Sequence, residues 1–340
     1  MTLAFLERAH LGRGAFSLRL GPDGRWTDDE PSDDAAGRAL LGLGTAAGSA
    51  PWPELRRRAT ALFEEAACFR SPWSRATAYA ALGAAALLAV DPDHGRARRL
   101  LGDAADQSEA LLAGGGAGRR TGGEPALAEP RPGGHLAGGP AADGPAAGWL
   151  WPEARLTYAN ALLPDAALAA ATALGRTGLA DAAIAVLEWL VAGELAGPDG
   201  RGRRWFSFTP AAGRGRGERR PAFDQQPIEA WAMADACARA FDVTGAVRFG
   251  EALELAAAWF LGENDAGLGM FDPATGGGFD GLGPAAVNLN QGAESTMAYV
   301  SVLATARARR GARRQAAPAR ASSRWETEAV AAPTQRSAAP

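Results

Sequence analysis

Apolar residues recur at three- and four-residue spacing through most of the chain, and this spacing predicts amphipathic helices. Proline and glycine separate the periodic stretches, for example at Pro51, Pro72 and Pro92. The predicted helices cover residues 3–9, 35–47, 52–67, 73–90, 95–112, 163–174, 179–195, 225–243, 246–261 and 293–310. About ten helices in successive pairs predict an all-α solenoid or toroid whose loops at one end form the binding face.

Strand signals are few. Residues 15–26 alternate and contain a Pro-Asp-Gly turn, which predicts a small hairpin, and residues 205–208 predict a short extended piece. Residues 114–148 are rich in Gly, Ala and Pro and predict a flexible loop. The resulting division is helical hairpins over 1–113, the loop over 114–148, hairpins with the polar motifs over 149–310, and a disordered tail over 311–340.

Composition excludes several classes of function. The net charge of -3 gives no basic face for nucleic acid, and the absence of Lys excludes a Walker-type phosphate loop and Schiff-base chemistry. Two distant Cys and three scattered His form no zinc pattern, so we expect no metal and no cofactor. The N-terminus does not resemble a secretory signal, and the longest apolar stretch, residues 76–90, is too short to span a bilayer. The expectation is a cytoplasmic protein without membrane or nucleic-acid partners.

Polar and aromatic side chains gather at three predicted loop-to-helix junctions. The first junction has Trp149, Trp151, Glu153, Tyr158 and Asn160. Ten Trp in an Ala-rich chain suit a cleft that stacks on sugars, although a Trp packed between helices is the alternative for each of them.

The second junction, residues 223–230, has Asp224, Gln225, Gln226 and Glu229 around Pro227. Asp224 fits an N-cap with Pro227 in the first turn, but its neighbours also form a dense set of donors and acceptors for hydroxyl groups. Both interpretations of Asp224 remain open from the sequence.

The third junction is a glycine-rich loop between Asp272 and Asp280, followed by Asn288, Asn290 and Gln291, and then by Glu294 in the first turn of a helix. Amides beside a carboxylate favour a neutral polyol over a phosphate. The structural alternative for Glu294 is an acidic side chain that stabilises its helix N-terminus.

Four segments carry a resemblance to a known family: WPEARLTYANALLPDAAL, FDQQPIEAWAMADACARA, WFLGENDAGLGMFDPATGGGFDGL and VNLNQGAESTMAY. From about residue 149 to 307 the chain resembles a bacterial helical-toroid family of the six-hairpin glycosidase superfamily, whose members are often labelled as glycosyltransferases. Asp33, Asp34 and Arg38, together with residues 69–72, resemble its middle region more weakly. The resemblance implies an incomplete (α/α)6 toroid that lacks an N-terminal helix pair.

The sequence departs from the family pattern in three ways. An N-terminal acidic Asp-Asp-Asn motif is missing, Ala159 stands where the family has Asp, and a Gly/Arg loop is reduced to residues 213–217. These departures weaken the case for retained catalysis.

Glycoside hydrolysis uses two carboxyl groups, about 5–5.5 Å apart for retention or about 6.5–9.5 Å apart for inversion. The catalytic candidates are Asp224, Glu294, Asp280 and Glu153, and the first two are expected to lie nearest the sugar. Trp151 and Tyr158 would stack on sugar rings. The expected substrate-binding set is completed by Asn160, Gln225, Gln226, Glu229, Asp272, Asn288, Asn290 and Gln291.

The leading hypothesis is a carbohydrate-active protein that acts on or binds an oligosaccharide or glycoside by carboxylate acid/base chemistry, as a glycosidase-like or glycosyl-transferring enzyme. One alternative is a non-catalytic glycan-binding subunit that partners a glycosyltransferase. A second alternative is a sugar epimerase, although epimerases of this fold use cleft His residues and the motif half of this chain has only Asp, Glu and amide candidates.

Overall fold

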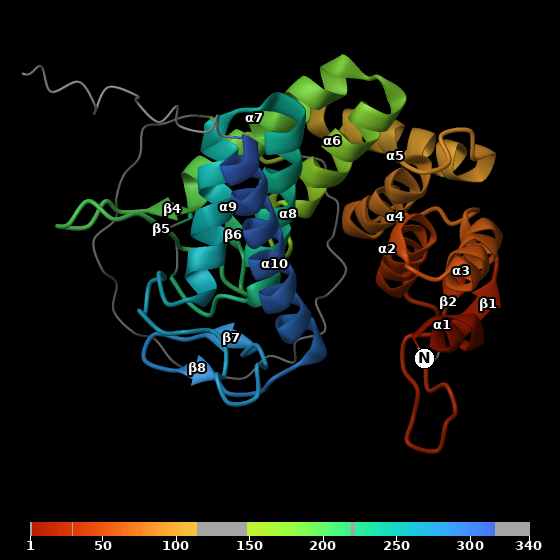
Figure 1. Cartoon of the computed structure of the whole chain (residues 1–340), viewed down its shortest axis with the longest axis horizontal. Helices are drawn as coiled ribbons and strands as arrows, with labels where there is room; N and C mark the ends of the chain where they lie inside the picture. Colours follow the sequence, from red (N-terminus) through yellow and green to blue (C-terminus); the bar gives the residue numbers. More distant parts are fainter. Residues whose placement is uncertain (1, 29, 114–147, 219–221, 317–340) are drawn as a thin grey trace, which may run out of the picture.

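A computed structural model describes residues 2–28, 30–113, 148–218 and 222–316, which form a mostly helical molecule (Figure 1). The all-α prediction is confirmed, and each predicted helix is present with bounds that differ by a few residues. The helices are α1 (Thr2–Ala9), α2 (Asp33–Ser49), α3 (Pro53–Ala66), α4 (Ser74–Leu88), α5 (Gly95–Ala113), α6 (Leu162–Leu174), α7 (Thr177–Glu194), α8 (Pro227–Thr244), α9 (Val247–Phe260) and α10 (Ala293–Ala316).

The helices alternate between an inner and an outer layer. Helices α2, α4, α6, α8 and α10 pack on one another in sequence order, and α3, α5, α7 and α9 cover them from outside. This series of inner helices curves back on itself, because Arg38 near the start of α2 contacts Glu294 at the start of α10, so the inner helices form an open ring with α2 and α10 at its two ends. This arrangement is an incomplete toroid of helical hairpins.

Connection lengths place the polar segments at one end of the ring. Short turns lead from each inner helix to the next outer helix, and two of them begin with a glycine in the left-handed conformation, Gly175 after α6 and Gly245 after α8. Long connections lead from the outer helices α5, α7 and α9 back to the inner ones. Because alternate helices run parallel, the five inner helices begin at the same end, and we name this end the N-terminal face.

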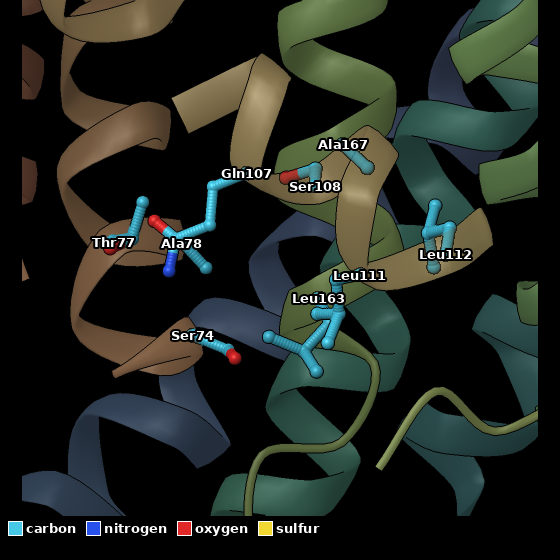
Figure 2. Close-up of a pocket in the computed structure, with 9 residues that line it drawn as sticks. All are labelled: Ser74, Thr77, Ala78, Gln107, Ser108, Leu111, Leu112, Leu163 and Ala167. Atoms are coloured by element: carbon cyan, nitrogen blue, oxygen red, sulfur yellow. The ribbon is translucent and has the colours of Figure 1, made fainter. Parts of the chain in front are cut away.

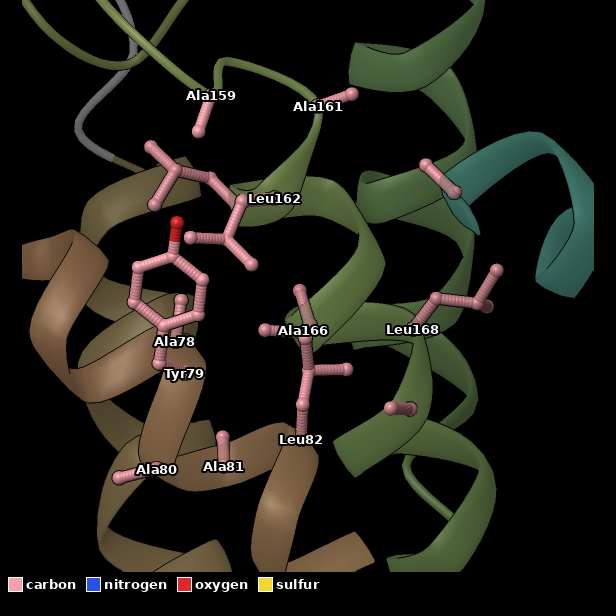
Figure 3. Packing of buried hydrophobic residues seen from close by; sticks show 14 of the residues in the cluster. Ala78, Tyr79, Ala80, Ala81, Leu82, Ala159, Ala161, Leu162, Ala166 and Leu168 are labelled. Carbon is pink, nitrogen blue, oxygen red and sulfur yellow. The ribbon is translucent and has the colours of Figure 1, made fainter. Parts of the chain in front are cut away.

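Small side chains allow the inner helices to approach closely. Alanine dominates α4 and α6, and larger residues fill the remaining space, as Leu82 does beside Ala166 in Figure 3. Burying a leucine side chain of this kind contributes roughly 2 kcal/mol. The core is therefore spread along the helix contacts, and it continues under the N-terminal face through Trp151 and Leu156.

Among the described residues, four two-stranded antiparallel sheets lie in the connections between helices. Their strands are β1 (His10–Gly12) with β2 (Ala15–Phe16), β3 (Arg155–Leu156) with β6 (Arg214–Gly215), β4 (Leu195–Ala196) with β5 (Trp205–Phe206), and β7 (Gly281–Leu282) with β8 (Val287–Asn288). An isolated bridge pairs Gln225 with Leu282, and so it joins the segment before α8 to the segment before α10.

Some local predictions were wrong in detail. In the 15–26 segment, β2 pairs with β1 instead of with the end of the segment. The expected hairpin forms only around the Pro-Asp-Gly turn, with one bridge between Leu20 and Trp26 and backbone hydrogen bonds from Gly21 to Arg25 and from Thr27 to Arg19. The N-cap of α8 is Gln226, so Asp224 lies two residues before the cap and is not the cap itself. Helix α10 continues to Ala316, into the tail predicted to be disordered. Residues 114–147 and 317–340 lie outside the described ranges.

Candidate functional site

An ion pair links the two ends of the open ring at the N-terminal face. Arg38 of α2 donates from Nε to Asp34 Oδ2 over 2.8 Å and from Nη1 to Glu294 Oε2 over 3.0 Å. Its guanidinium also lies over the ring of Tyr79 of α4, 4.6 Å from the centroid. The Glu294 side chain is 51% exposed. Glu294 therefore lies at the opening of the ring, with its charge balanced by Arg38.

Tyr158, in the connection before α6, reaches the same cluster. Its hydroxyl donates to Asp34 Oδ1 over 3.1 Å. Burial and the nearby charge of Asp34 raise the pKa of Tyr158, so its hydroxyl keeps its proton and can donate. The predicted residues Tyr158 and Glu294 thus meet through Asp34 and Arg38, although they come from different hairpins.

Arg75 of α4 holds the connection that carries Tyr158. It donates to the Tyr158 carbonyl over 2.6 Å, to Asn160 Oδ1 over 3.3 Å and to the Glu153 carboxylate over 2.9 Å. The Glu153 side chain is only 14% exposed. Glu153 is therefore a mostly buried partner of Arg75, and its predicted catalytic role stays a prediction.

Asn160 and Glu229 form a buried pair below the face. Glu229 of α8 accepts from the backbone of Ala159 and from both the backbone and the side chain of Asn160, at 3.2 and 3.0 Å for the latter two. Ala159 has a φ of 46°, an unfavourable value for a residue with a Cβ. Both side chains are buried and stabilise this turn, so their prediction as substrate-binding groups was wrong.

Gln225 and Trp151 are also buried. Gln225 accepts from the Phe208 backbone over 3.2 Å and from Trp259 Nε1 over 2.9 Å, and it donates to the Ala222 carbonyl. Trp151 is 1% exposed and donates to the Arg155 carbonyl over 2.9 Å. Their polar groups are satisfied by hydrogen bonds inside the protein, which allows both side chains to be buried. Buried side chains of this kind do not reach the surface where a ligand would bind. Their predicted roles in orienting hydroxyls and stacking on sugars were wrong.

The glycine-rich loop keeps its polar groups at the surface. Asp272 accepts from the Ala274 backbone over 2.8 Å and from Gln291 Nε2 over 3.2 Å, and Asn290 Nδ2 donates to Asp280. The hydrogen bond from Ala274, supported by Gln291, lowers the pKa of Asp272.

Asp280 is half-buried beside the start of α10. Partial burial acts to raise its pKa, but hydrogen bonds from Ser295, Asn290 and Gly292 outweigh it and lower the pKa. A carboxyl of this kind stays ionised at neutral pH, so it fits a hydroxyl acceptor better than a proton donor.

Asp224, Gln226 and Asn288 complete the predicted set at the same end. Asp224 and Asn288 are exposed and Gln226 is half-buried. Asp224 lies against the β7–β8 turn, since a Cβ on Gly283 would be 3.8 Å from its Oδ1. The exposed position of Asp224 leaves its carboxylate accessible to a ligand.

Four residues at this face were not predicted as site residues: Asp34, Arg38, Arg75 and Tyr79. The Asp33-Asp34 pair and Arg38 carried a weak motif signal, whereas Arg75 and Tyr79 lie in an Ala-rich helix without one. Their roles depend on contacts between hairpins that are distant in sequence, and the spacing of residues within one helix does not show such contacts.

Burial of Glu229 gives a testable pH dependence. Burial and the adjacent Glu194 raise its pKa from 4.5 to about 8. The folded state then holds a proton that the unfolded chain releases above pH 4.5, so stability should fall as pH rises towards 8, by up to about 1.4 kcal/mol per unit. Urea unfolding at pH 5, 6, 7 and 8 measures this slope.

The control for this prediction is Glu229→Gln. Burial and Asp165 raise the pKa of Asp235 to about 7. Asp235 therefore also lowers the stability as pH rises, but only up to about pH 7. The variant should therefore lose the share of Glu229 in the decline across pH 5 to 8. Its stability should still fall up to about pH 7 because of Asp235, but it should be nearly level between pH 7 and 8. A wild-type protein that gains stability across this interval would contradict a protonated Glu229.

Other features of the described residues give no competing site. The crevice between α4, α5 and α6 has a volume of about 10 Å³, near the minimum for one water (Figure 2). Within the described ranges, no three His, Cys, Asp or Glu side chains are grouped to hold a metal ion. None of the described helices combines the length and the apolar character needed to cross a membrane.

Comparison with known proteins gives little further information. No family model matches the chain, and no curated protein matches it. One matching solved structure is an unsaturated glucuronyl hydrolase specific for heparin, at 13% sequence identity and a TM-score of 0.44. The match covers 76% of this chain and 65% of that one, so the chain spans less than two thirds of its length. Because likeness at this level does not identify a ligand, function is inferred below from the residues of this chain.

Proposed function

We propose that this protein binds a neutral oligosaccharide at the N-terminal face and turns it over slowly. The observation that carries the proposal is the gathering of amides and carboxylates from the segments before α2, α6, α8 and α10 at one end of the ring. Asp224, Asn288 and Asn290 are exposed there, and Tyr158 and Glu294 meet at the junction of α2 and α10.

The balance of charges supports a neutral ligand. Arg38 is matched by Asp34 and Glu294, and Arg75 is matched by Glu153, so neither arginine presents a free positive charge for an anionic group. Carboxylate and amide oxygens that already lie in fixed positions can accept hydrogen bonds from hydroxyl groups with little further ordering.

Slow turnover follows from the state of the carboxyl groups. A general acid at neutral pH needs a raised pKa in a position that touches the substrate. At this face the pKa values of Asp272 and Asp280 are lowered, and Glu153 and Glu294 are ion-paired. Of the predicted catalytic pair, Asp224 is exposed and Glu294 is ion-paired with Arg38.

A second candidate function is a glycan-binding subunit that partners a glycosyltransferase and performs no chemistry itself. The ion pairs of Glu153 and Glu294 favour it, because groups held in this way support binding without proton transfer. Product analysis distinguishes it from slow hydrolysis.

The test is a glycan array with the purified protein, followed by calorimetry on any glycan that binds. Asp224→Ala and Glu294→Ala should each weaken binding by about tenfold or more, since each removes a charged hydrogen-bond acceptor. Glu109→Ala, at an exposed position of the outer helix α5, should bind as the wild type does.

Two results would contradict the proposal. One is a cooperatively folded protein that binds no glycan on the array. The other is unchanged affinity in both site variants. Rapid hydrolysis of a bound glycan would be consistent with binding at the N-terminal face, but it would contradict slow turnover.

A further inference from the structure

Helix α10 exposes an apolar side. Met297 and Val300 are 53% and 54% exposed, and the smaller apolar residues Ala293, Ala304 and Ala308 are exposed as well. Their spacing of three and four residues places all five on one side of the helix, over about 22 Å of its length. We name these five residues the α10 stripe. A continuous exposed apolar surface of this kind is typical of a contact with another protein.

The opposite side of α10 belongs to the core. It carries buried residues at the same helical spacing, which are Ser295, Ala298, Val302 and Ala306. Helix α10 packs on α8 and α9 (Figure 1). That packing accounts for one apolar side of the helix, whereas the α10 stripe points away from it.

Two ion pairs hold α10 in this orientation. Arg309 donates from Nε to Asp242 Oδ1 of α8 over 3.2 Å. Arg310 donates from Nε to Glu254 Oε2 of α9 over 2.6 Å. The helix is therefore anchored on both flanks, and the α10 stripe is presented without further ordering of the backbone. Binding a partner to a surface fixed in this way costs less entropy than binding it to a mobile one.

The side-chain sizes along the α10 stripe are self-complementary. Consider the α10 helices of two copies side by side and antiparallel, with a two-fold axis beside Val300. Met297 of each copy then lies opposite Ala304 of the other, and Ala293 lies opposite Ala308. A large side chain opposite a small one allows two helices to approach to about 8–10 Å. A parallel pair would place Met297 against itself and Ala304 against itself, which packs less evenly.

Charges at the two ends of the α10 stripe favour the same arrangement. Thr296, Val300 and Arg307 share a flank of α10 by their spacing. Thr296 Oγ1 accepts from the Gly278 backbone over 3.1 Å, so the glycine-rich loop lies on that flank at the start of the helix. In an antiparallel pair the same flanks meet, which brings Arg307 of each copy to the side of the other copy's loop. The lowered pKa of Asp272 keeps the carboxylate of that loop charged at neutral pH, so opposite charges face each other.

We propose that this protein forms a homodimer through the α10 stripe, in which the α10 helices of two copies pack antiparallel around a two-fold axis near Val300. A two-fold contact uses the same surface on both copies, so it requires the self-complementarity that the stripe has. The N-terminal faces of the two copies then lie at opposite ends of the dimer. This inference is independent of glycan binding.

The first experiment is sedimentation equilibrium of the full chain. The wild type should form a dimer with a Kd in the micromolar range, because one helix pair buries a small interface. Val300→Asp places two like charges beside the two-fold axis and should raise the Kd about 100-fold or more. The matched control is Val90→Asp, at a 57% exposed valine after α4, which should dimerise as the wild type does.

The second experiment tests the antiparallel orientation by disulfide crosslinking in a Cys68→Ser background, which removes the exposed native thiol. Val300→Cys should give a covalent dimer on oxidation, because the two-fold axis brings this position next to its own copy. Ala293→Cys should stay uncrosslinked, because its two copies would be about 20 Å apart, far beyond the reach of a disulfide.

Three results would overturn the inference. A monomeric wild type would leave the α10 stripe to a different protein. Wild-type dimerisation in Val300→Asp would place the contact on another surface. Equal crosslinking of Ala293→Cys and Val300→Cys would indicate a parallel pair. Thermal melting identifies misfolding, and if Val300→Asp is unfolded, the isosteric Val300→Thr, with an expected tenfold loss of affinity, and the crosslinking decide the question.

Discussion

The variant Gly44→Val is expected to lower the free energy of unfolding by about 3 kcal/mol, because it forces apart the most closely packed pair of inner helices. A Cβ on Gly44 of α2 would lie 1.9 Å from the Gly83 carbonyl oxygen of α4, and a Cβ on Gly83 would lie 2.1 Å from the Leu40 carbonyl oxygen. A backbone oxygen cannot move aside as a flexible side chain can. The change should appear in urea unfolding as a lower midpoint with an unchanged slope.

The control lies on the same helix. A Cβ on Gly42 would meet nothing within 4 Å, so Gly42→Ala should stabilise the protein by about 0.5–1 kcal/mol through the higher helix propensity of alanine. Wild-type stability in Gly44→Val would show that α2 and α4 are further apart than the structure places them.

The variant Arg75→Ala is expected to destabilise the protein by about 3 kcal/mol and to abolish glycan binding. Arg75 is 8% exposed and partners Glu153, Asn160 and the Tyr158 carbonyl. Its removal leaves the mostly buried Glu153 carboxylate without a counter-charge, which costs more than the pair itself contributes. Tyr158 would then lose the contact that holds its backbone beside Asp34.

Two further variants test this explanation. Arg57→Ala removes the pair with Glu54, in which Arg57 is 76% exposed, and should cost less than about 1 kcal/mol. Glu153→Gln in the Arg75→Ala background should recover part of the stability, because it removes the unpaired charge. Additive losses in this double variant would show that the two side chains do not interact.

The extent of successful prediction differed between helices and side chains. The helix at residues 95–112 was predicted almost to its ends, since its apolar residues repeat at three- and four-residue spacing and Pro92 precedes it. Asp224 was one candidate for the N-cap of α8, but the cap is Gln226, because the polar residues around Pro227 include several that are able to begin a helix. Local patterns therefore predict the presence of a helix more accurately than they predict its first residue.

The side chains of the candidate site divide in a similar way. Sequence position placed Asp224, Asp280 and Glu294 near helix starts, and the ring of helices brings those starts to one end. Asn160, Glu229 and Gln225 belong to the same motifs but lie buried beneath that end, where they hold the turns together. A polar motif at a loop-to-helix junction has the same composition whether its side chains meet a ligand or one another.

By itself, the sequence determined that this protein is helical, that its helices come in pairs, and that its carboxylates and amides stand where helices begin, because these properties depend on residue spacing of one or two turns. Only the tertiary structure decided that Trp151 is core and that Arg38 joins Asp34 to Glu294. Each of those outcomes depends on which helices become neighbours, and this is set by packing among residues far apart in the chain.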